Sequence, residues 1–214
     1  MLGENLHAQK LRVGITARAV APLLSSSNYP INKNVNPGYG LGMKGEFNFH
    51  RHLGISLGIE YSRWGIEFDG RFLEYPDHTT PAGNLYHHKI RANEILVPLL
   101  IKIDSDSLLG NKLFYGYVGY LAQSVLKSST EITFNTNGEL LYEGEADLRY
   151  YGWDAITSGI GMEFKFSGMS NIFFGEFNVN YNFSPFLYHG KPDFASNDMS
   201  IKVSSLSLGF GAYF

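Results

Sequence analysis

The sequence predicts an all-β fold, an eight-stranded antiparallel up-and-down transmembrane β-barrel with a side-chain-filled lumen. Three observations lead to this prediction. Segments of about ten residues alternate apolar and polar side chains with a period of two, which is the pattern of a strand whose faces meet different solvents. Long and short connections alternate between these segments. The last segment ends on an aromatic residue, Phe214.

Composition agrees with one β-rich domain. The 214 residues include 24 glycines, 15% aromatic and only 17% charged residues. No cysteine is present, which excludes a disulfide scaffold and a cysteine-based metal or redox site. The net charge of −3, without a cluster of Lys and Arg, argues against nucleic acid as a partner. The longest apolar run, residues 95–101, is far shorter than the roughly 20 residues of a membrane helix.

The chain divides into a short start and one domain. Residues 1–9 are expected to be a disordered start or a signal remnant, because Leu6-His7-Ala8 before Gln9 could be the end of a cleavage site. Residues 10–214 are expected to form the barrel.

The first three strands are expected over residues 10–21, 38–49 and 53–64. Each places aliphatic or aromatic residues on one face and glycine, serine or charged residues on the other. In the third strand the alternation is predicted to slip near Arg63. Polar loops at residues 22–37 and 69–86 are long, whereas the turn at residues 50–52 is short.

The middle strands are less regular. The fourth, residues 89–103, contains Pro98, and proline cannot donate to a β-ladder and belongs at edges or bulges. The fifth, residues 112–126, has aromatic residues on both faces, so its facing cannot be assigned. Asn137-Gly138 then predicts a β-hairpin standing on a long loop.

The last three strands are expected over residues 153–166, 172–183 and about 199–214. The short link at residues 167–171 joins the first two of them. Long connections therefore follow the odd-numbered strands and short ones the even-numbered strands, as in outer-membrane barrels with long outside loops and short inside turns. Both termini are expected on the periplasmic side.

The faces of the strands favour a membrane location. Aromatic residues are expected in two interfacial girdles, one at the short-turn rim (Phe47, Phe49, Phe164, Phe166, Phe173, Phe214) and one at the opposite rim (Tyr39, Tyr61, Trp64, Trp153, Tyr181, Phe183). The non-aromatic face carries five residues of each charge sign, predicted to form a lumen ion-pair network: Arg12, Arg18, Lys44, Lys102, Lys165, Glu46, Glu60, Glu94, Glu163 and Glu176. The alternative is a soluble lipocalin-like ligand-binding barrel, whose apolar side chains would point inward.

The spacing Ser207-x-Gly209-x-x-Ala212-x-Phe214 resembles the C-terminal signal that the barrel-assembly machinery reads in outer-membrane proteins. The segment Ile95-Leu96-Val97-Pro98-Leu99-Leu100-Ile101-Lys102 resembles the Pro-containing strand of the Bacteroidota outer-membrane β-barrel family that includes the PorT-like group. Gly159-Ile160-Gly161, Gly175-Glu176-Phe177 and Leu208-Gly209-Phe210 are similar to its later strands. The resemblance implies an eight-stranded barrel in the outer membrane and no common activity.

No spacing indicates catalysis. A lipid-modifying enzyme of the outer leaflet would use a histidine as general base for a serine, and the candidates are His78, His87, His88 and His189 with Ser62, Glu74 and Asp77. His50-x-His52 offers two metal ligands at most, so neither a metal nor a cofactor is expected.

The connecting segments are the expected contact surface. Their aromatic and apolar residues either meet a partner or fold back over the barrel mouth: Phe72, Tyr75, Phe186, Leu187, Tyr188 and Phe194. We therefore expect a non-enzymatic protein that contacts outer-membrane lipids, the barrel-assembly machinery during insertion, and protein partners. Its expected role is a structural or accessory subunit of a secretion or outer-membrane biogenesis complex. The lipid-modifying enzyme and the soluble barrel are the alternatives.

Overall fold

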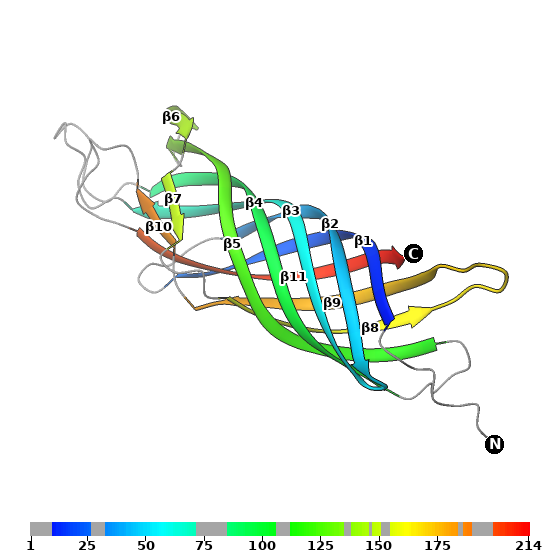
Figure 1. Ribbon diagram of the computed structural model, residues 1–214. Helices are drawn as coiled ribbons and strands as arrows, with labels where there is room; N and C mark the ends of the chain where they lie inside the picture. Colours follow the sequence, from blue (N-terminus) through cyan, green and yellow to red (C-terminus); the bar gives the residue numbers. More distant parts are fainter. Residues whose placement is uncertain are drawn as a thin grey trace, which may run out of the picture.

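The computed structural model describes residues 10–26, 33–71, 85–105, 112–134, 138–145, 147–150, 155–183, 186–189 and 199–214. Within these ranges eight strands follow one another in the antiparallel order β1-β2-β3-β4-β5-β8-β9-β11, and β1 also pairs with β11 to close the ring (Figure 1). Their bounds are β1 Lys10–Ser26, β2 Lys33–His50, β3 Leu53–Arg71, β4 Leu85–Asp104, β5 Lys112–Phe134, β8 Ala155–Phe164, β9 Ile172–Asn182 and β11 Met199–Tyr213. The predicted eight-stranded up-and-down barrel is confirmed.

The two ends of the barrel differ. At one end β2 and β3 are joined by the two-residue turn Arg51–His52, and residues 165–171 join β8 and β9. We call this end the turn rim, and β1 begins and β11 ends there (Figure 1). At the opposite end, the loop rim, β1, β3 and β5 end and β2, β4 and β8 begin. The described chain contains no helix long and apolar enough to cross a membrane.

Three short strands stand at the loop rim. β6 (Leu140–Glu145) pairs with the end of β5, and Gly138 in the connection between them has a φ of 70°, the left-handed region that glycine tolerates best. The hairpin predicted around Asn137-Gly138 is therefore present. β7 (Asp147–Tyr150) pairs with β10 (Phe186–His189), and β10 pairs with β11. These two strands were not predicted from the sequence.

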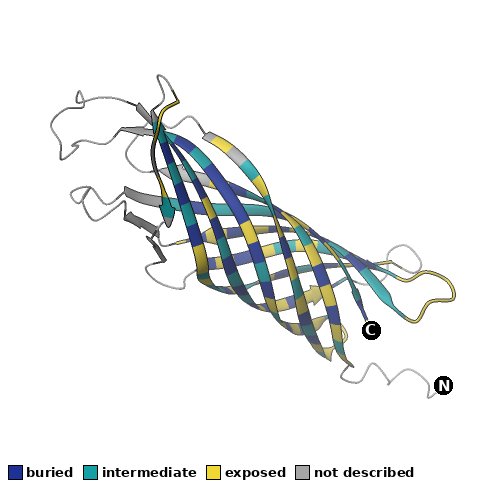
Figure 2. Ribbon diagram, turned by 90° about the horizontal axis from the view of Figure 1, so that it is seen from above, coloured by how far each residue is buried: buried dark blue, intermediate teal, exposed yellow. Residues whose placement is uncertain are grey.

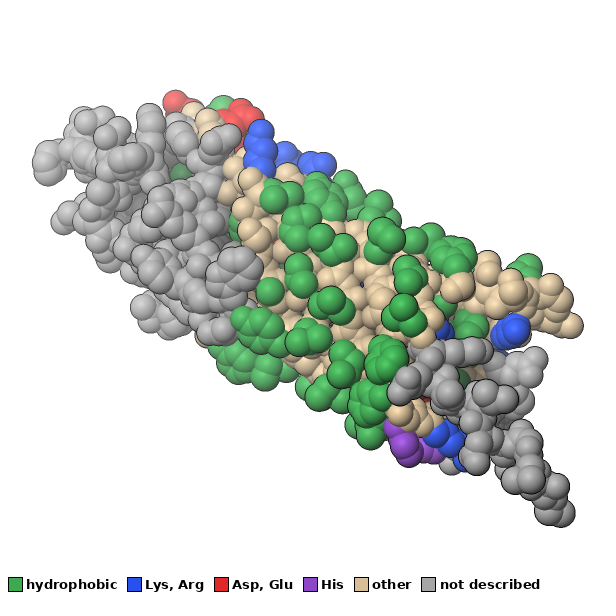
Figure 3. All heavy atoms as spheres, in the orientation of Figure 1, with side chains coloured by type: hydrophobic (Ala, Val, Ile, Leu, Met, Phe, Trp, Pro, Cys, Tyr) green, Lys and Arg blue, Asp and Glu red, His purple; other side chains and the backbone are tan. Residues whose placement is uncertain are grey.

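Inward and outward side chains alternate along each barrel strand (Figure 2). On the turn-rim side of the barrel, large apolar side chains point outward, with exposed fractions of 72% for Leu11 and 68% for Ile160. Charged side chains point inward, and Glu46 is 1% exposed. The soluble lipocalin-like alternative requires the reverse arrangement. On the face seen in Figure 3, hydrophobic side chains are spread over the middle of the barrel, with backbone and uncharged polar groups between them, and we call this surface the apolar wall.

Toward the loop rim this polarity inverts. In β4 the outward series Ile103, Ile101, Leu99, Val97 and Ile95 becomes Asn93, Arg91, Lys89 and His87. The inward series of the same region is mainly apolar, and Ile66, Phe68 and Ile90 are at most 1% exposed, although His88, Ser128 and Thr130 are also buried there. The wall therefore changes from an apolar exterior around a charged interior to a polar exterior around a mainly apolar interior. The change occurs at the level of Arg63 and Asn93.

Two predictions about this region are wrong. The alternation of β3 does not slip at Arg63, because Trp64, Ile66 and Phe68 continue the inward series of Glu60 and Ser62. The polarity of each face changes instead: the inward face becomes mainly apolar and the outward face polar. In a sequence, this inversion looks the same as a one-residue slip in the alternation. For the same reason Trp64 belongs to no girdle, since it points inward and is 5% exposed. Trp153 lies outside the described residues.

The structure settles two points that the sequence left open, the place of Pro98 in β4 and the facing of β5. Pro98 points inward, and its Cγ would lie 3.2 Å from a Cβ placed on Gly58, so the proline ring occupies the space above that glycine. The facing of β5 reverses at a bulge, where Glu94 pairs with Val125 but Asn93 pairs with Lys127. Below the bulge Tyr115 and Tyr117 are buried inside, and above it Ser128, Thr130 and Ile132 take the inward positions.

Candidate functional site

The lumen on the turn-rim side is filled by a turn-side cluster of buried ionic groups, formed by Arg12, Glu46, Lys102, Asp104 and Glu163. The guanidinium of Arg12 donates to both oxygens of Glu163, at 2.7 and 3.0 Å, and also pairs with Glu46. Lys102 Nζ lies 2.9 Å from Glu46 Oε1 and 3.2 Å from Asp104 Oδ1, and it pairs with Glu163. Four strands are thus linked through their side chains.

Aromatic residues complete the turn-side cluster. The Tyr213 hydroxyl donates to Glu46 Oε2 at 2.7 Å, and the Arg12 guanidinium lies 4.6 Å from the Tyr213 ring centre. Lys102 Nζ lies 4.3 Å from the ring centre of Tyr115. These contacts give each cation a negative partner and an aromatic face, which is how buried charge is retained at tolerable cost.

A central cluster lies next to it and consists of Arg18, Lys44, Glu60 and Glu176. Lys44 Nζ donates to Glu176 Oε1 at 3.1 Å and lies 3.7 Å from the Phe174 ring centre. Arg18 Nε lies 3.2 Å from Glu60 Oε2, and its Nη2 is 3.5 Å from Glu176 Oε1. Beyond this cluster a cavity of about 20 Å³, with Arg18, Glu60, Glu94 and Ser62 in its lining, has room for about one water molecule.

The structure places nine of the ten residues of the expected network inside the barrel: Arg12, Arg18, Lys44, Glu46, Glu60, Glu94, Lys102, Glu163 and Glu176. Lys165 is the exception, and its placement in the network was wrong. β8 ends at Phe164, so Lys165 lies in the connection at the turn rim, and its side chain is exposed. Sequence reasoning missed Asp104, Tyr115 and Tyr213. Asp104 and Tyr213 continue inward series, so their parity could have identified them.

The residues of the expected assembly signal lie along the closing strand. Ser207 and Gly209 are buried on the inner face, and Ser207 Oγ accepts a hydrogen bond from Asn178 at 3.2 Å. Phe214 is 71% exposed on the outside, and its amide donates to the Val13 carbonyl oxygen at 3.0 Å. Ala212 is half-buried beside it. This segment ends at the seam between β1 and β11, on the turn rim.

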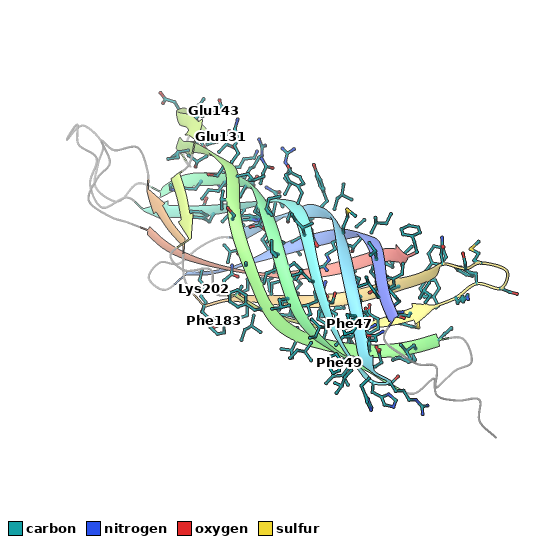
Figure 4. The ribbon with its side chains drawn as sticks, in the orientation of Figure 1. Phe47, Phe49, Glu131, Glu143, Phe183 and Lys202 are labelled. Atoms are coloured by element: carbon teal, nitrogen blue, oxygen red, sulfur yellow. The ribbon has the colours of Figure 1, made fainter. Side chains whose placement is uncertain are left out.

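The structure describes some of the residues that were expected in the aromatic girdles and in the contact segments. Phe47 and Phe49 lie outside near the turn rim, and Phe183 lies near the opposite edge of the apolar wall (Figure 4). Of the expected contact segments, the backbone of residues 186–188 belongs to β10 and is not part of a loop. Phe72, Tyr75 and Phe194 lie outside the described residues.

His87 and His88 do not meet Ser62, the serine that the sequence offered as their nucleophile. His87 points outward, where its Nδ1 lies 2.9 Å from Asp69 Oδ1. His88 points inward and stacks on Phe68 with ring centres 4.9 Å apart. Ser62 lies opposite Glu94, six residues along β4 from His88, which is roughly 20 Å of strand. The described residues include no group of three His, Cys, Asp or Glu that could hold a metal. Residues 74, 77 and 78 lie outside these ranges.

We expect His88 to make the loop-rim part of the barrel sensitive to pH. Burial lowers the pKa of His88 to about 3, with a further lowering by His87 and an opposing effect of Asp69. An unfolded histidine titrates near pH 6.5, so the stability that neutral His88 provides is complete above that pH and is lost as the pH falls toward 3. We expect the free energy of unfolding to fall by up to about 1.4 kcal/mol per pH unit in this window.

The test is urea unfolding of the refolded protein in detergent at several values between pH 7.5 and 4. His88→Phe should remove this part of the slope, because a neutral ring of similar size then faces Phe68. Equal slopes in the variant and the parent protein would contradict the assignment.

Comparison with known proteins identifies the fold. The family model described as outer membrane protein beta-barrel domain matches residues 7–188. Among solved structures, OprG from Pseudomonas aeruginosa matches with a TM-score of 0.51 and 13% identity, covering 96% of this chain and 95% of that chain. Neisserial surface protein A gives a TM-score of 0.42, 10% identity and coverage of 96% and 97%. Ail of Yersinia pestis gives a TM-score of 0.39 and 15% identity, covering 97% of this chain and 99% of that chain. No curated protein matches the sequence.

Proposed function

Because the chain belongs to the outer membrane protein beta-barrel domain family and lies in the outer membrane, we propose that it is a non-enzymatic structural or accessory subunit of a larger envelope assembly. A secretion machine or the outer-membrane biogenesis machinery is the kind of assembly that we propose. In this proposal both termini are periplasmic, the loop rim faces the outside, and the segment that ends at Phe214 is the signal for insertion.

The filled lumen is the observation that carries this proposal. Glu46, Lys102 and Glu163 are at most 4% exposed, and Lys102 pairs with both carboxylates across the barrel. The cavity of about 20 Å³ beyond them is too small for a solute. In the part of the barrel that the structure describes, this packed interior supports a role for the outer surface and the connections more than a role in transport.

The lipid-modifying alternative receives no support from the described residues. Nucleophilic catalysis needs a serine within hydrogen-bond reach of its base. His87 lies on the outer face beside Asp69, whereas Ser62 is fully buried inside. If this alternative were correct, the lipids of cells that produce the protein would differ in mass, and the difference would disappear in His87→Ala.

Affinity purification from native membranes tests the role as a subunit. The protein would be tagged at its N-terminus, solubilised in mild detergent and purified, and the accompanying proteins would be identified by mass spectrometry. We expect one or a few envelope proteins in fixed ratio to the bait. An unrelated tagged barrel of similar abundance is the control. A bait that elutes alone, at the size of a monomer in detergent, would contradict the proposal.

A further inference from the structure

A group of basic side chains stands directly above the apolar wall. Arg63 of β3 lies opposite Asn93 of β4, and Asn93 lies opposite Lys127 of β5. Arg91 lies two residues before Asn93 in β4 and shares its outward face. Arg63, Arg91 and Lys127 are exposed, and we call them the basic belt. Lys and Arg side chains gather at the upper edge of the wall in Figure 3.

Two bulges shape this region. The bulge in β5 leaves both Leu126 and Lys127 exposed, so the lysine joins the arginines on the outside. A second irregularity, between Asn36 and Tyr39 of β2, lies beside Arg63. Next to it, Gly65 contributes no side chain, and an open depression of about 280 Å³ forms here. Its lining includes Tyr39, Arg63, Gly65, Glu67, Lys89 and Arg91.

The depression keeps an excess of positive charge. Its single carboxylate, Glu67, accepts a hydrogen bond from Asn36 at 2.8 Å and lies 3.6 Å from Lys89 Nζ. Glu67 and Lys89 therefore offset each other. Arg63 and Arg91 form no ion pair with any other residue in the part of the chain that the structure describes. Two guanidinium groups thus line an open depression without an ion-pair partner among the described residues.

The surface below the basic belt determines what kind of anion fits. Outward side chains just beneath it are Tyr61, Ile95, Val97 and Leu126, and Leu126 is 59% exposed. Tyr61 donates a hydrogen bond to Asn93 at 3.0 Å, as an interfacial aromatic with a polar tip does. A ligand here meets guanidinium groups above and a hydrocarbon-facing wall below. An amphipathic anion satisfies both surfaces, whereas a free anion would use only one.

We propose that the basic belt binds the phosphate group of an outer-leaflet lipid whose acyl chains lie on the apolar wall beneath it. Guanidinium groups match phosphate oxygens in a bidentate geometry, and partial exclusion of water by the lipid strengthens the contact. This inference rests on the proposed function in one respect: the orientation proposed there, with the loop rim outside, determines that the outer leaflet supplies the lipid. The binding itself is a property of the surface.

Native mass spectrometry of the protein in detergent can measure this binding, with diphosphorylated lipid A and chemically dephosphorylated lipid A as probes. We expect the phosphorylated lipid to bind and the dephosphorylated one to bind much more weakly. Arg63→Gln/Arg91→Gln should reduce affinity roughly 30-fold, since each basic residue near a lipid surface contributes about 1 kcal/mol. Lys127→Gln should reduce it less. Lys112→Gln/Lys165→Gln removes two charges at the turn rim and should leave affinity unchanged.

Four results would overturn the proposal: wild-type affinity in Arg63→Gln/Arg91→Gln, equal binding of the dephosphorylated lipid, an equal loss in the Lys112→Gln/Lys165→Gln control, or complete displacement of the lipid by an equimolar amount of inorganic phosphate. Retained heat-modifiable migration shows that each variant folds.

The orientation of the barrel is tested separately. Because the chain has no cysteine, Glu143→Cys at the loop rim reports outside exposure through labelling of intact cells by an impermeant maleimide (Figure 4).

Discussion

Replacement of Lys102 by methionine is expected to destabilise the folded barrel by about 3–5 kcal/mol, the usual cost of removing one partner from a buried ionic group. Lys102 is 3% exposed and contacts the carboxylates of Glu46, Asp104 and Glu163. Methionine fills a similar volume but leaves Arg12 as the single cation of the turn-side cluster. The remaining carboxylates would then repel one another in a site that water does not reach.

Urea unfolding in detergent, followed on unboiled gels, measures the change. Lys165→Met is the matched control, because Lys165 is exposed at the turn rim and its replacement should change stability by less than about 0.5 kcal/mol. Equal unfolding midpoints for Lys102→Met and Lys165→Met would mean that Lys102 does not hold the carboxylates together.

Replacement of Gly211 by alanine is expected to weaken the seam that closes the barrel. A Cβ at this position would lie 2.2 Å from the carbonyl oxygen of Ile15 and 2.2 Å from Cζ of Phe174. Ile15 belongs to β1, so its carbonyl cannot retreat without opening the β1–β11 ladder. Forced overpacking of this kind costs about 1–3 kcal/mol and sometimes more.

Gly175→Ala provides the comparison. Gly175 is on the neighbouring strand β9, but a Cβ there would meet the Phe210 ring at 3.5 Å, an ordinary contact. We expect Gly175→Ala to refold like the parent protein and Gly211→Ala to give a smaller heat-modifiable fraction and a lower unfolding midpoint. A Gly211→Ala barrel as stable as the Gly175→Ala barrel would show that the seam adapts to the added methyl group.

Most of the barrel could be predicted from the sequence because a period of two reports directly which side chains share a face. Alternation does not say which solvent each face meets. For this reason the interior position of Trp64 was missed, although its parity with Glu60 is plain in the sequence. The extra residue at Leu126 was also invisible, since a bulge is defined by the partner strand.

The candidate site, like the barrel, could be predicted in part from the sequence. The charged residues of the lumen follow from parity, because a charge on the lipid face would be costly. Lys165 was misplaced because parity continues past Phe164, where the strand itself has ended. The basic belt was not predicted, because Arg63, Arg91 and Lys127 are far apart in sequence and meet only through the registers of β3, β4 and β5.

The inversion of polarity in the wall also determines how far the barrel extends beyond its apolar exterior. β3 continues for eight residues after Arg63, to Arg71, which corresponds to roughly 20 Å of rise at the usual strand tilt. The apolar exterior ends below this level, so the upper barrel holds the end of β3 and the beginning of β4 away from the apolar wall. A partner that contacts these strand ends would therefore need no apolar surface of its own.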